Sequence, residues 1–219
     1  MLKGAIFDMD GVLVDNMQIH VEAFVEMARR YGVTFDHERM MSMNGMGNGE
    51  FFKVLFPPEV VERVGVAGLS EEKEALYREL FASQLAPAPG LVELLEALRA
   101  AGVKCAVGSS GMKKNVDFVL DGLDIRRYFD AVVCSEMVAR TKPAPDIYLL
   151  ALSLIGLSAD ECLVFEDALA GVEAARAAGI RTVGLATSLS REALAAVPDV
   201  VLAVDDFATL SPESLAKLV

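Results

Sequence analysis

Two carboxylates stand two residues apart where a short apolar run ends. Residues 3–7 are mostly apolar, as expected for a strand buried in a parallel sheet, and Asp8, Asp10 and Gly11 follow at once. The C-terminal ends of such strands meet at the ligand-binding edge of an open α/β sheet. Two acids there repel each other and are costly to desolvate, which indicates a cation site or acid–base chemistry. Taken alone, the segment is equally typical of an acidic turn.

Two later segments place phosphate-binding groups after further apolar runs. Ser109 and Ser110 follow residues 103–108 in a glycine-containing loop, whose hydroxyls and amides suit phosphate oxygens. Lys142 stands in the proline-rich segment 141–146, where an ammonium group could pair with a carboxylate and with phosphate oxygens. The ordinary alternatives are a Gly/Ser turn and a surface lysine.

A second pair of acids ends another apolar run. Glu166 and Asp167 follow residues 162–165, and together with the first pair they would supply hard oxygen ligands for Mg²⁺. The alternative for Asp167 is structural, because an aspartate just before the helix predicted at 168–178 is a typical N-cap.

The elements that would position these residues alternate from about residue 90 onward. Apolar runs of strand length are separated by amphipathic stretches, which predicts βαβ units and a doubly wound, Rossmann-like parallel sheet with helices on both faces. The predicted strands lie at 103–108, 131–134, 162–165, 181–184 and 200–204, and the predicted helices lie at 91–101, 114–120, 145–155, 168–178 and 190–195.

Residues 16–85 show helical periodicity without clear strands. An apolar stripe runs along residues 19–31, and Ser70 followed by two glutamates predicts a helix start. We therefore expect an α/β core formed by 1–15 and 86–219, with an inserted α-helical cap domain at 16–85 that could act as a lid.

The composition excludes several classes of function. The chain has 219 residues, 53% of them hydrophobic, and 20 basic against 32 acidic residues, a formal net charge of −12. Such a charge disfavours nucleic acid or anionic membranes as partners, and no apolar run reaches the length of a spanning helix. Three widely spaced cysteines argue for reduced thiols and, with no signal-peptide pattern, for a cytoplasmic protein. Nothing in the sequence requires more than a monomer.

The four polar segments, in this order and at strand ends, resemble the haloacid dehalogenase superfamily of phosphotransferases. The resemblance covers essentially the whole chain, and residues 7–13, 142–146 and 166–171 look most like its beta-phosphoglucomutase and small-phosphatase branch. It implies a Rossmann-like core with an α-helical cap, and a phosphate ester as the small-molecule partner.

The resemblance also implies roles for the polar residues. Asp8 would be the nucleophile that forms an aspartyl-phosphate, and Asp10 would be the general acid and then the general base. Ser109 would bind the transferring phosphoryl group, and Lys142 would neutralise Asp8 and the phosphoryl oxygens. The implied Mg²⁺ ligands are Asp8, Asp10 through its backbone carbonyl, Glu166 and Asp167.

The cap decides between two reactions. The implied substrate contacts are His20, Asn16, Gly45 and Ser110. In the mutase branch the cap loop carries basic residues that bind a second phosphate, but residues 43–49 keep only the glycine, and Lys53 is the nearest cation. Losing such charge-assisted contacts would cost on the order of a few kcal/mol. We therefore expect an Mg²⁺-dependent phosphatase for a small phosphomonoester, with a sugar phosphate as a candidate.

Two alternatives remain. The first is a beta-phosphoglucomutase-like sugar-phosphate mutase. The second, which we favour less, is a phosphoacceptor signalling module of the flavodoxin-like type, which also places acids, a hydroxyl and a lysine around Mg²⁺.

Overall fold

The computed structural model of the chain describes residues 1–34 and 48–219. The chain divides into two compact units: Met1–Asp15 together with Leu85–Val219 form one, and Asn16–Gln84 form the other. We call them the core unit and the helical unit.

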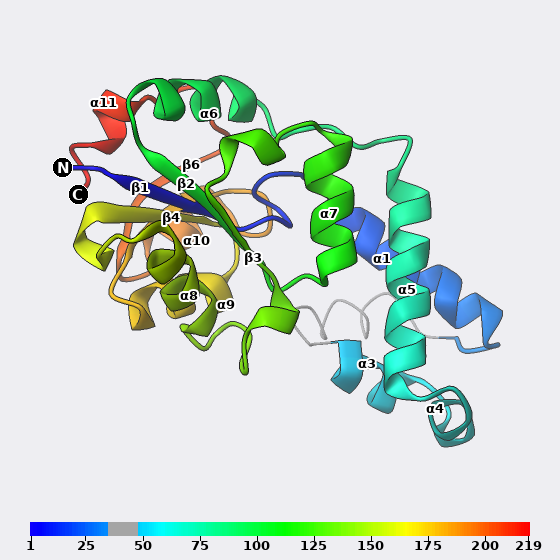
Figure 1. Ribbon diagram of the computed structural model, residues 1–219. Coiled ribbons are helices and arrows are strands. Elements are labelled where there is room, and N and C mark those ends of the chain that lie inside the picture. The colour runs from blue at the N-terminus through cyan, green and yellow to red at the C-terminus, as the bar shows by residue number, and fades with distance from the viewer. Residues whose placement is uncertain (35–47) are drawn as a thin grey trace. The chain divides into compact units, whose positions relative to one another are not determined.

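The core unit contains six parallel strands in one sheet, ordered β3-β2-β1-β4-β5-β6 (Figure 1). This confirms the predicted doubly wound α/β fold. The order is that of a Rossmann sheet and differs from the 2-1-3-4-5 order of the flavodoxin-like type, to which receiver modules belong. The strands are β1 (Gly4–Phe7), β2 (Lys104–Gly108), β3 (Ala131–Val133), β4 (Cys162–Glu166), β5 (Arg181–Leu185) and β6 (Val200–Val204).

The direction of winding reverses at β1, which lies between β2 and β4. Ile6 is in register with Ala106 on one side and with Val164 on the other. In open α/β sheets the ligand crevice lies beyond the carboxyl ends of the strands at this switch point. The fold therefore places the binding edge where β1 and β4 end.

Helices cover both faces of the sheet. Figure 1 shows α6 on the opposite side of the sheet from α8 and α9. The core-unit α-helices are α6 (Leu91–Ala100), α7 (Lys113–Gly122), α8 (Asp146–Ile155), α9 (Leu169–Ala177), α10 (Arg191–Ala195) and α11 (Pro212–Leu215), and the short 3₁₀ turns are η1 (Arg126–Tyr128), η2 (Ser135–Met137) and η3 (Ala159–Glu161).

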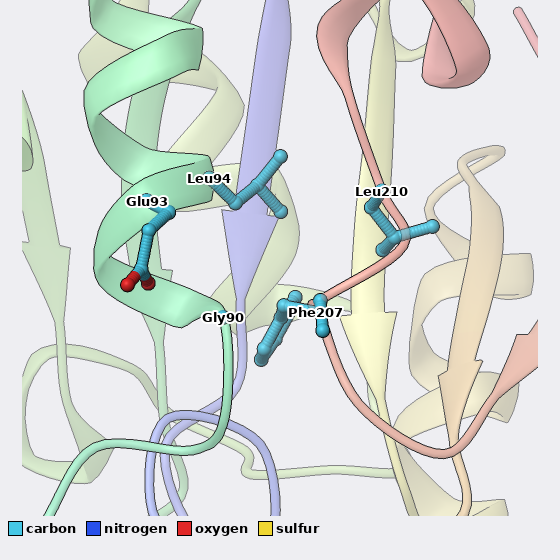
Figure 2. A pocket seen from close by; sticks show the side chains of 6 residues that line it. Gly90, Glu93, Leu94, Phe207 and Leu210 are labelled. Atoms are coloured by element: carbon cyan, nitrogen blue, oxygen red, sulfur yellow. The ribbon is translucent and has the colours of Figure 1, made fainter.

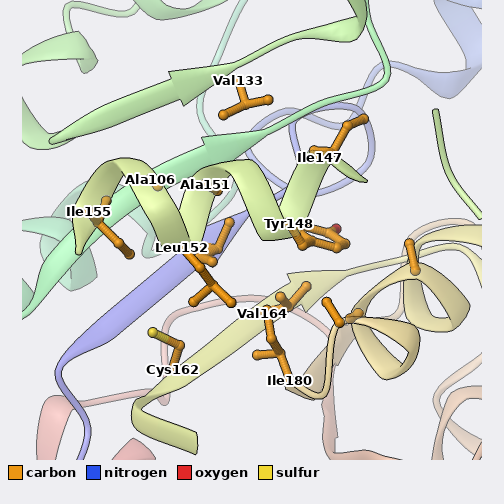
Figure 3. Close-up of a cluster of buried hydrophobic side chains, with 14 of the residues drawn as sticks. Ala106, Val133, Ile147, Tyr148, Ala151, Leu152, Ile155, Cys162, Val164 and Ile180 are labelled. Atoms are coloured by element: carbon orange, nitrogen blue, oxygen red, sulfur yellow. The ribbon is translucent and has the colours of Figure 1, made fainter. Parts of the chain in front are cut away.

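The alternation of strand side chains explains the two layers. Ile6 and Val164 belong to the buried cluster that includes side chains of α8 and α9. Figure 3 shows Val164 facing the residues of this cluster. Their neighbours Phe7 and Phe165 belong to the other face, where the two rings stack with centroids 4.5 Å apart. Each such fully buried side chain contributes roughly 1.5–3 kcal/mol to folding.

The helical unit consists of α1 (Met17–Arg30), α3 (Asn48–Leu55), α4 (Pro58–Val64) and α5 (Val66–Phe81) among its described residues. Ile19, Ala23 and Met27 of α1 recur every four residues and are buried, as the apolar stripe predicts. The predicted helix start at Ser70 is wrong, because α5 begins at Val66. Gly65, whose φ is 77°, separates α4 from α5. It is the N-cap residue of α5, and no side chain caps that helix.

The three cysteines, Cys105, Cys134 and Cys162, are buried free thiols, as predicted. Burial raises the pKa of Cys105 and of Cys162 to about 12, so both stay protonated. Within residues 1–34 and 48–219, no helix has the length and apolar character needed to cross a membrane.

Candidate active site

The loop after β1 is held against the end of β4. The side chain of Asp8 is buried, and its backbone amide donates to the carbonyl of Phe165 at 3.0 Å. Gly11 has a φ of 77°, and a Cβ there would overlap the Asp167 carboxylate. Glycine is therefore required both for the turn and for the close approach of the two loops.

Asp10 and Ser109 both lie close to Gly111 in the loop after β2. A Cβ built on Gly111 would lie 3.0 Å from Ser109 Oγ and 3.6 Å from Asp10 Oδ2. The Gly111 amide donates to Ser109 Oγ at 2.9 Å, and Ser109 is buried. The structure thus brings the predicted acid–base group next to the predicted phosphoryl-binding hydroxyl.

Lys142 bridges two of the predicted acids. Its Nζ lies 2.5 Å from Asp8 Oδ1 and 2.6 Å from Glu166 Oε1, and its side chain is only 7% exposed. The Lys142–Pro143 peptide bond is cis. An ion pair between Arg140 and Asp146, at 2.7 Å, closes the loop that carries the lysine.

Glu166 is surrounded by donors on both carboxylate oxygens. Oε1 accepts from Lys142 Nζ and from the hydroxyl of Tyr148, each at 2.6 Å. Oε2 accepts the backbone amides of Asp167 at 3.1 Å and of Ala168 at 3.4 Å. A Cβ on Gly171 would overlap this carboxylate, which explains the glycine in the first turn of α9.

Asp167 is not the N-cap of α9, so the capping alternative is wrong. The N-cap is Ala168, and no side chain caps the helix there. Asp167 Oδ2 instead accepts the hydroxyl of Ser188, and the hydroxyl of Thr187 lies 3.3 Å from the same oxygen and 2.6 Å from the Gly11 carbonyl. Sequence reasoning missed these two hydroxyls, although their position directly after β5 puts them at the same sheet edge.

The strand-end cluster, which we define as Asp8, Lys142, Glu166 and Asp167, carries more negative than positive charge. Burial, reinforced by neighbouring carboxylates and only partly offset by Lys142, raises the pKa of Asp8 well above its ordinary value. Burial and Glu166 raise the pKa of Asp167 from 3.8 to about 7. Burial lowers the pKa of Lys142, but attraction to Asp8 and Glu166 outweighs it and raises that pKa, so the ammonium persists.

This excess of negative charge suits a divalent metal ion. One ligand oxygen from each of Asp8, Glu166 and Asp167 lies within 4.8 Å of the other two, and all three residues are buried. Three carboxylates surround one ammonium group in this cluster, and carboxylate oxygens suit Mg²⁺. The Asp10 carboxylate is not in this group of three; its predicted contribution is the backbone carbonyl.

The predicted substrate contacts do not all belong to one unit. Asn16 and His20 are in the helical unit, where Asn16 Nδ2 donates to the Tyr77 hydroxyl at 2.6 Å and His20 stacks on the Tyr77 ring at 4.0 Å. Ser110 is exposed in the loop after β2. Gly45 lies outside the described residues.

The helical unit also contains a buried cation that sequence reasoning missed. Lys73 is 2% exposed, and its Nζ lies 2.9 Å from Glu74 Oε1 and 2.6 Å from His20 Nδ1. Its ammonium group also lies 4.8 Å from the centre of the Phe24 ring. Lys53, the cation noted from the sequence, is exposed on α3. A lysine followed by a glutamate in a helix is typical of a solvated face, so no signal distinguished Lys73.

A separate hollow lies in the core unit near the start of α6. Figure 2 shows Glu93, Leu94, Phe207 and Leu210 around it, and Gly90 and Ala208 complete the lining. One carboxylate and no cation line this hollow, so it suits a phosphate ester poorly. None of the predicted site residues lines it.

Comparison with known proteins shows one consistent family. Residues 2–179 match the model of haloacid dehalogenase-like hydrolases. The chain is 33% identical over 180 residues to the fructose-1-phosphate phosphatase YqaB of Escherichia coli. The matched region covers 82% of this chain and 94% of that protein.

Solved structures agree with this match. A haloacid dehalogenase hydrolase of family IA from Entamoeba histolytica superposes with a TM-score of 0.89 at 26% identity, covering 99% of both chains. The beta-phosphoglucomutase of Clostridium difficile superposes with a TM-score of 0.82 at 26% identity, covering 100% of this chain and 97% of the other.

Proposed function

Because the chain belongs to the haloacid dehalogenase-like hydrolases, we propose that it is a Mg²⁺-dependent phosphatase that hydrolyses a small phosphomonoester, with sugar phosphates as the candidate class. The observation that carries this proposal is the Lys142 ammonium between Asp8 and Glu166, inside a buried cluster with excess negative charge. A carboxylate can attack an anionic phosphate only where cations offset the repulsion. A named phosphatase among the relatives supports the same reaction.

In the proposed reaction, Asp8 attacks the phosphorus atom and the ester oxygen leaves. Asp10, beside Ser109 in the structure, gives its proton to the departing alkoxide, so the alcohol leaves neutral. An acyl phosphate on Asp8 results. Asp10 then takes a proton from water, whose oxygen attacks the acyl phosphate; this regenerates the Asp8 carboxylate and releases inorganic phosphate.

The remaining residues of the site neutralise the charge of the phosphoryl group and orient Asp8. Ser109 and Lys142 contact the phosphoryl oxygens, and Lys142 also holds the Asp8 carboxylate in place. Asp8, Asp167 and the carbonyl of Asp10 would hold Mg²⁺ directly. Glu166, whose oxygens already have four protein donors, would contribute its charge at the edge of that site. When bound, the ion would neutralise charge on the phosphoryl group.

The test is hydrolysis of a panel of sugar phosphates and other phosphomonoesters, with Mg²⁺ and with a chelator, by the wild type and Asp8→Asn. We expect Asp8→Asn to lose at least about 10⁴-fold in kcat, as in other enzymes that lose their nucleophile. Asp130→Asn is the matched control, because Asp130 is an aspartate of the same unit that accepts only the Cys105 amide among the hydrogen bonds described. Full turnover by Asp8→Asn would contradict the role of Asp8.

The likeness to a beta-phosphoglucomutase structure supports a second candidate, a sugar-phosphate mutase. The half-buried His20 and the buried Lys73 of the helical unit are polar groups that such a reaction could use to bind a sugar. Incubation with β-glucose 1-phosphate and a bisphosphate activator separates the two reactions. Accumulation of the 6-phosphate isomer would support the mutase, and release of inorganic phosphate alone would reject it.

We further propose that the helical unit, Asn16–Gln84, acts as a cap over the site. A cap that excludes water and contacts the alcohol part of the ester would set substrate choice. Exchanging residues 16–84 for those of a relative with a known substrate, while keeping the core unit, tests this. The expected result is transfer of substrate preference with retention of Mg²⁺ dependence, and unchanged preference would contradict it.

A further inference from the structure

Tyr148 is a fully buried tyrosine whose hydroxyl contacts the strand-end cluster. Its ring belongs to the hydrophobic cluster under the sheet, between α8 and β4, together with Ile147 and Val164 (Figure 3). Its hydroxyl nonetheless donates to Glu166 Oε1 at 2.6 Å. A phenylalanine would pack equally well in this apolar setting, so the hydroxyl calls for a separate explanation.

The hydroxyl and Lys142 share one carboxylate oxygen. Lys142 Nζ lies 2.6 Å from the same Glu166 Oε1 and 2.5 Å from Asp8 Oδ1. The ammonium group also lies 4.8 Å from the centre of the Tyr148 ring. One tyrosine therefore contacts both partners of the ion pair, through its hydroxyl and through its ring face.

We infer that Tyr148 is a positioning residue that keeps Lys142 available to Asp8 and to the phosphoryl group. Glu166 and Asp8 compete for a single ammonium group. The Tyr148 hydroxyl is a second strong donor to Oε1 of Glu166. Because it shares this acceptor with Lys142, it weakens the attraction between Glu166 and the lysine. Without the hydroxyl, Lys142 would be drawn towards Glu166 and away from the reacting groups. The inference rests on the proposed phosphatase reaction, in which Lys142 contacts phosphoryl oxygens.

The test compares Tyr148→Phe with Tyr128→Phe. Tyr128 is a matched control, because it is also a buried tyrosine of the core unit whose hydroxyl donates to a glutamate, Glu96, at 3.0 Å. Removing a partner that orients an active-site ligand typically lowers affinity or activity by 10–100-fold. We expect Tyr148→Phe to lower kcat/KM by about 10-fold or more, and Tyr128→Phe to leave kcat/KM unchanged.

Binding of inorganic phosphate in the presence of Mg²⁺, measured by isothermal titration calorimetry, provides a readout that needs no turnover. We expect a Kd about 10-fold higher for Tyr148→Phe than for Tyr128→Phe, at matching melting temperatures. An unchanged phosphate Kd in Tyr148→Phe would overturn the inference. A wild type that binds phosphate but hydrolyses no ester would contradict the proposed function instead.

A double-mutant cycle tests whether Tyr148 acts through Glu166. Glu166→Gln removes the charge that competes for Lys142, so adding Tyr148→Phe to it should lower phosphate affinity less than twofold further. Losses that simply multiply would overturn the inference, because they would show that the hydroxyl acts independently of Glu166.

Discussion

The two units each bury a lysine among acids, but they balance the charge differently. In the strand-end cluster of the core unit, one ammonium, Lys142, faces the carboxylates of Asp8, Glu166 and Asp167. In the helical unit, one ammonium, Lys73, faces one carboxylate, Glu74, with the imidazole of His20 as a further partner. The first arrangement places three carboxylates around one ammonium group, whereas the second pairs one carboxylate with one ammonium group.

The comparison indicates that the strand-end cluster is a binding site, whereas the Lys73–Glu74 pair stabilises the helical unit. Buried like charges are retained at a cost in stability, which makes sense where an ion and an anionic substrate are to be bound. A balanced pair with additional hydrogen bonds has its charges satisfied inside the unit. We therefore expect the core cluster to respond to ligands and the helical-unit pair to respond to the loss of its partner.

The largest effect should come from breaking the balanced pair. Lys73→Met would leave the Glu74 carboxylate buried without its ammonium partner, which typically costs about 3–5 kcal/mol in the free energy of unfolding. Chemical denaturation, with amide hydrogen exchange in α1 and α5 as a local probe, would measure the loss.

The double variant Lys73→Met with Glu74→Gln is the control for this prediction. The double variant also removes the buried charge that Lys73 neutralises, so most of the lost stability should return. If the double variant were as unstable as Lys73→Met, the charge of Glu74 would not be the cause of the loss, and Lys73 would stabilise the unit through its contact with the Phe24 ring.

A smaller effect should come from adding the divalent cation proposed for the core cluster. An ion that binds only the folded state stabilises it by about 2.7 kcal/mol at a concentration of 100 times its Kd. Mg²⁺ should therefore raise the melting temperature of the wild type, and Asp167→Asn should remove most of that rise. Asp130→Asn should keep it. An equal rise in Asp167→Asn would place the ion elsewhere.

The strand ends that carry the site could be predicted because buried parallel strands form continuous apolar runs. Asp8, Ser109 and Glu166 each follow or end such a run, so their common edge follows from the fold class alone. Lys142 stands well past the end of β3, and the residues alone left two alternatives for it, a pairing with a carboxylate and a surface position.

The rest depends on contacts that have no local pattern. Tyr148 lies on the buried face of α8 and looks like a core residue, because its hydroxyl partner is 18 positions away. The position of Asp167 just before α9 suggested an N-cap. Its carboxylate instead accepts a hydrogen bond from the hydroxyl of Ser188, which is distant in sequence. The pairing of Lys73 with His20 likewise joins α5 to α1 across 53 positions.

The smallest effect should come from a charge cluster on the surface of the helical unit. Glu26 Oε2 lies 2.7 Å from Arg29 Nε and its Oε1 lies 2.9 Å from Arg30 Nε, and these hydrogen bonds lower the pKa of Glu26 from 4.5 to about 2. A lowered carboxyl pKa stabilises the folded state above the unfolded pKa of 4.5, and this contribution is lost as the pH falls towards 2. Because the group is exposed, Glu26→Gln should lower the melting temperature at pH 7 by about 1 °C or less.

The difference in melting temperature between the wild type and Glu26→Gln should shrink below pH 4.5. At pH 7 the same difference should shrink in 1 M salt, where the screening length is about 3 Å. The buried Lys73–Glu74 pair is screened far less, so the loss caused by Lys73→Met should persist in the same salt. Differential scanning calorimetry of both variants at low and high salt measures this. If salt reduced both effects equally, the buried pair would behave like a surface pair, and the contrast between satisfied and solvated charges in the helical unit would not hold.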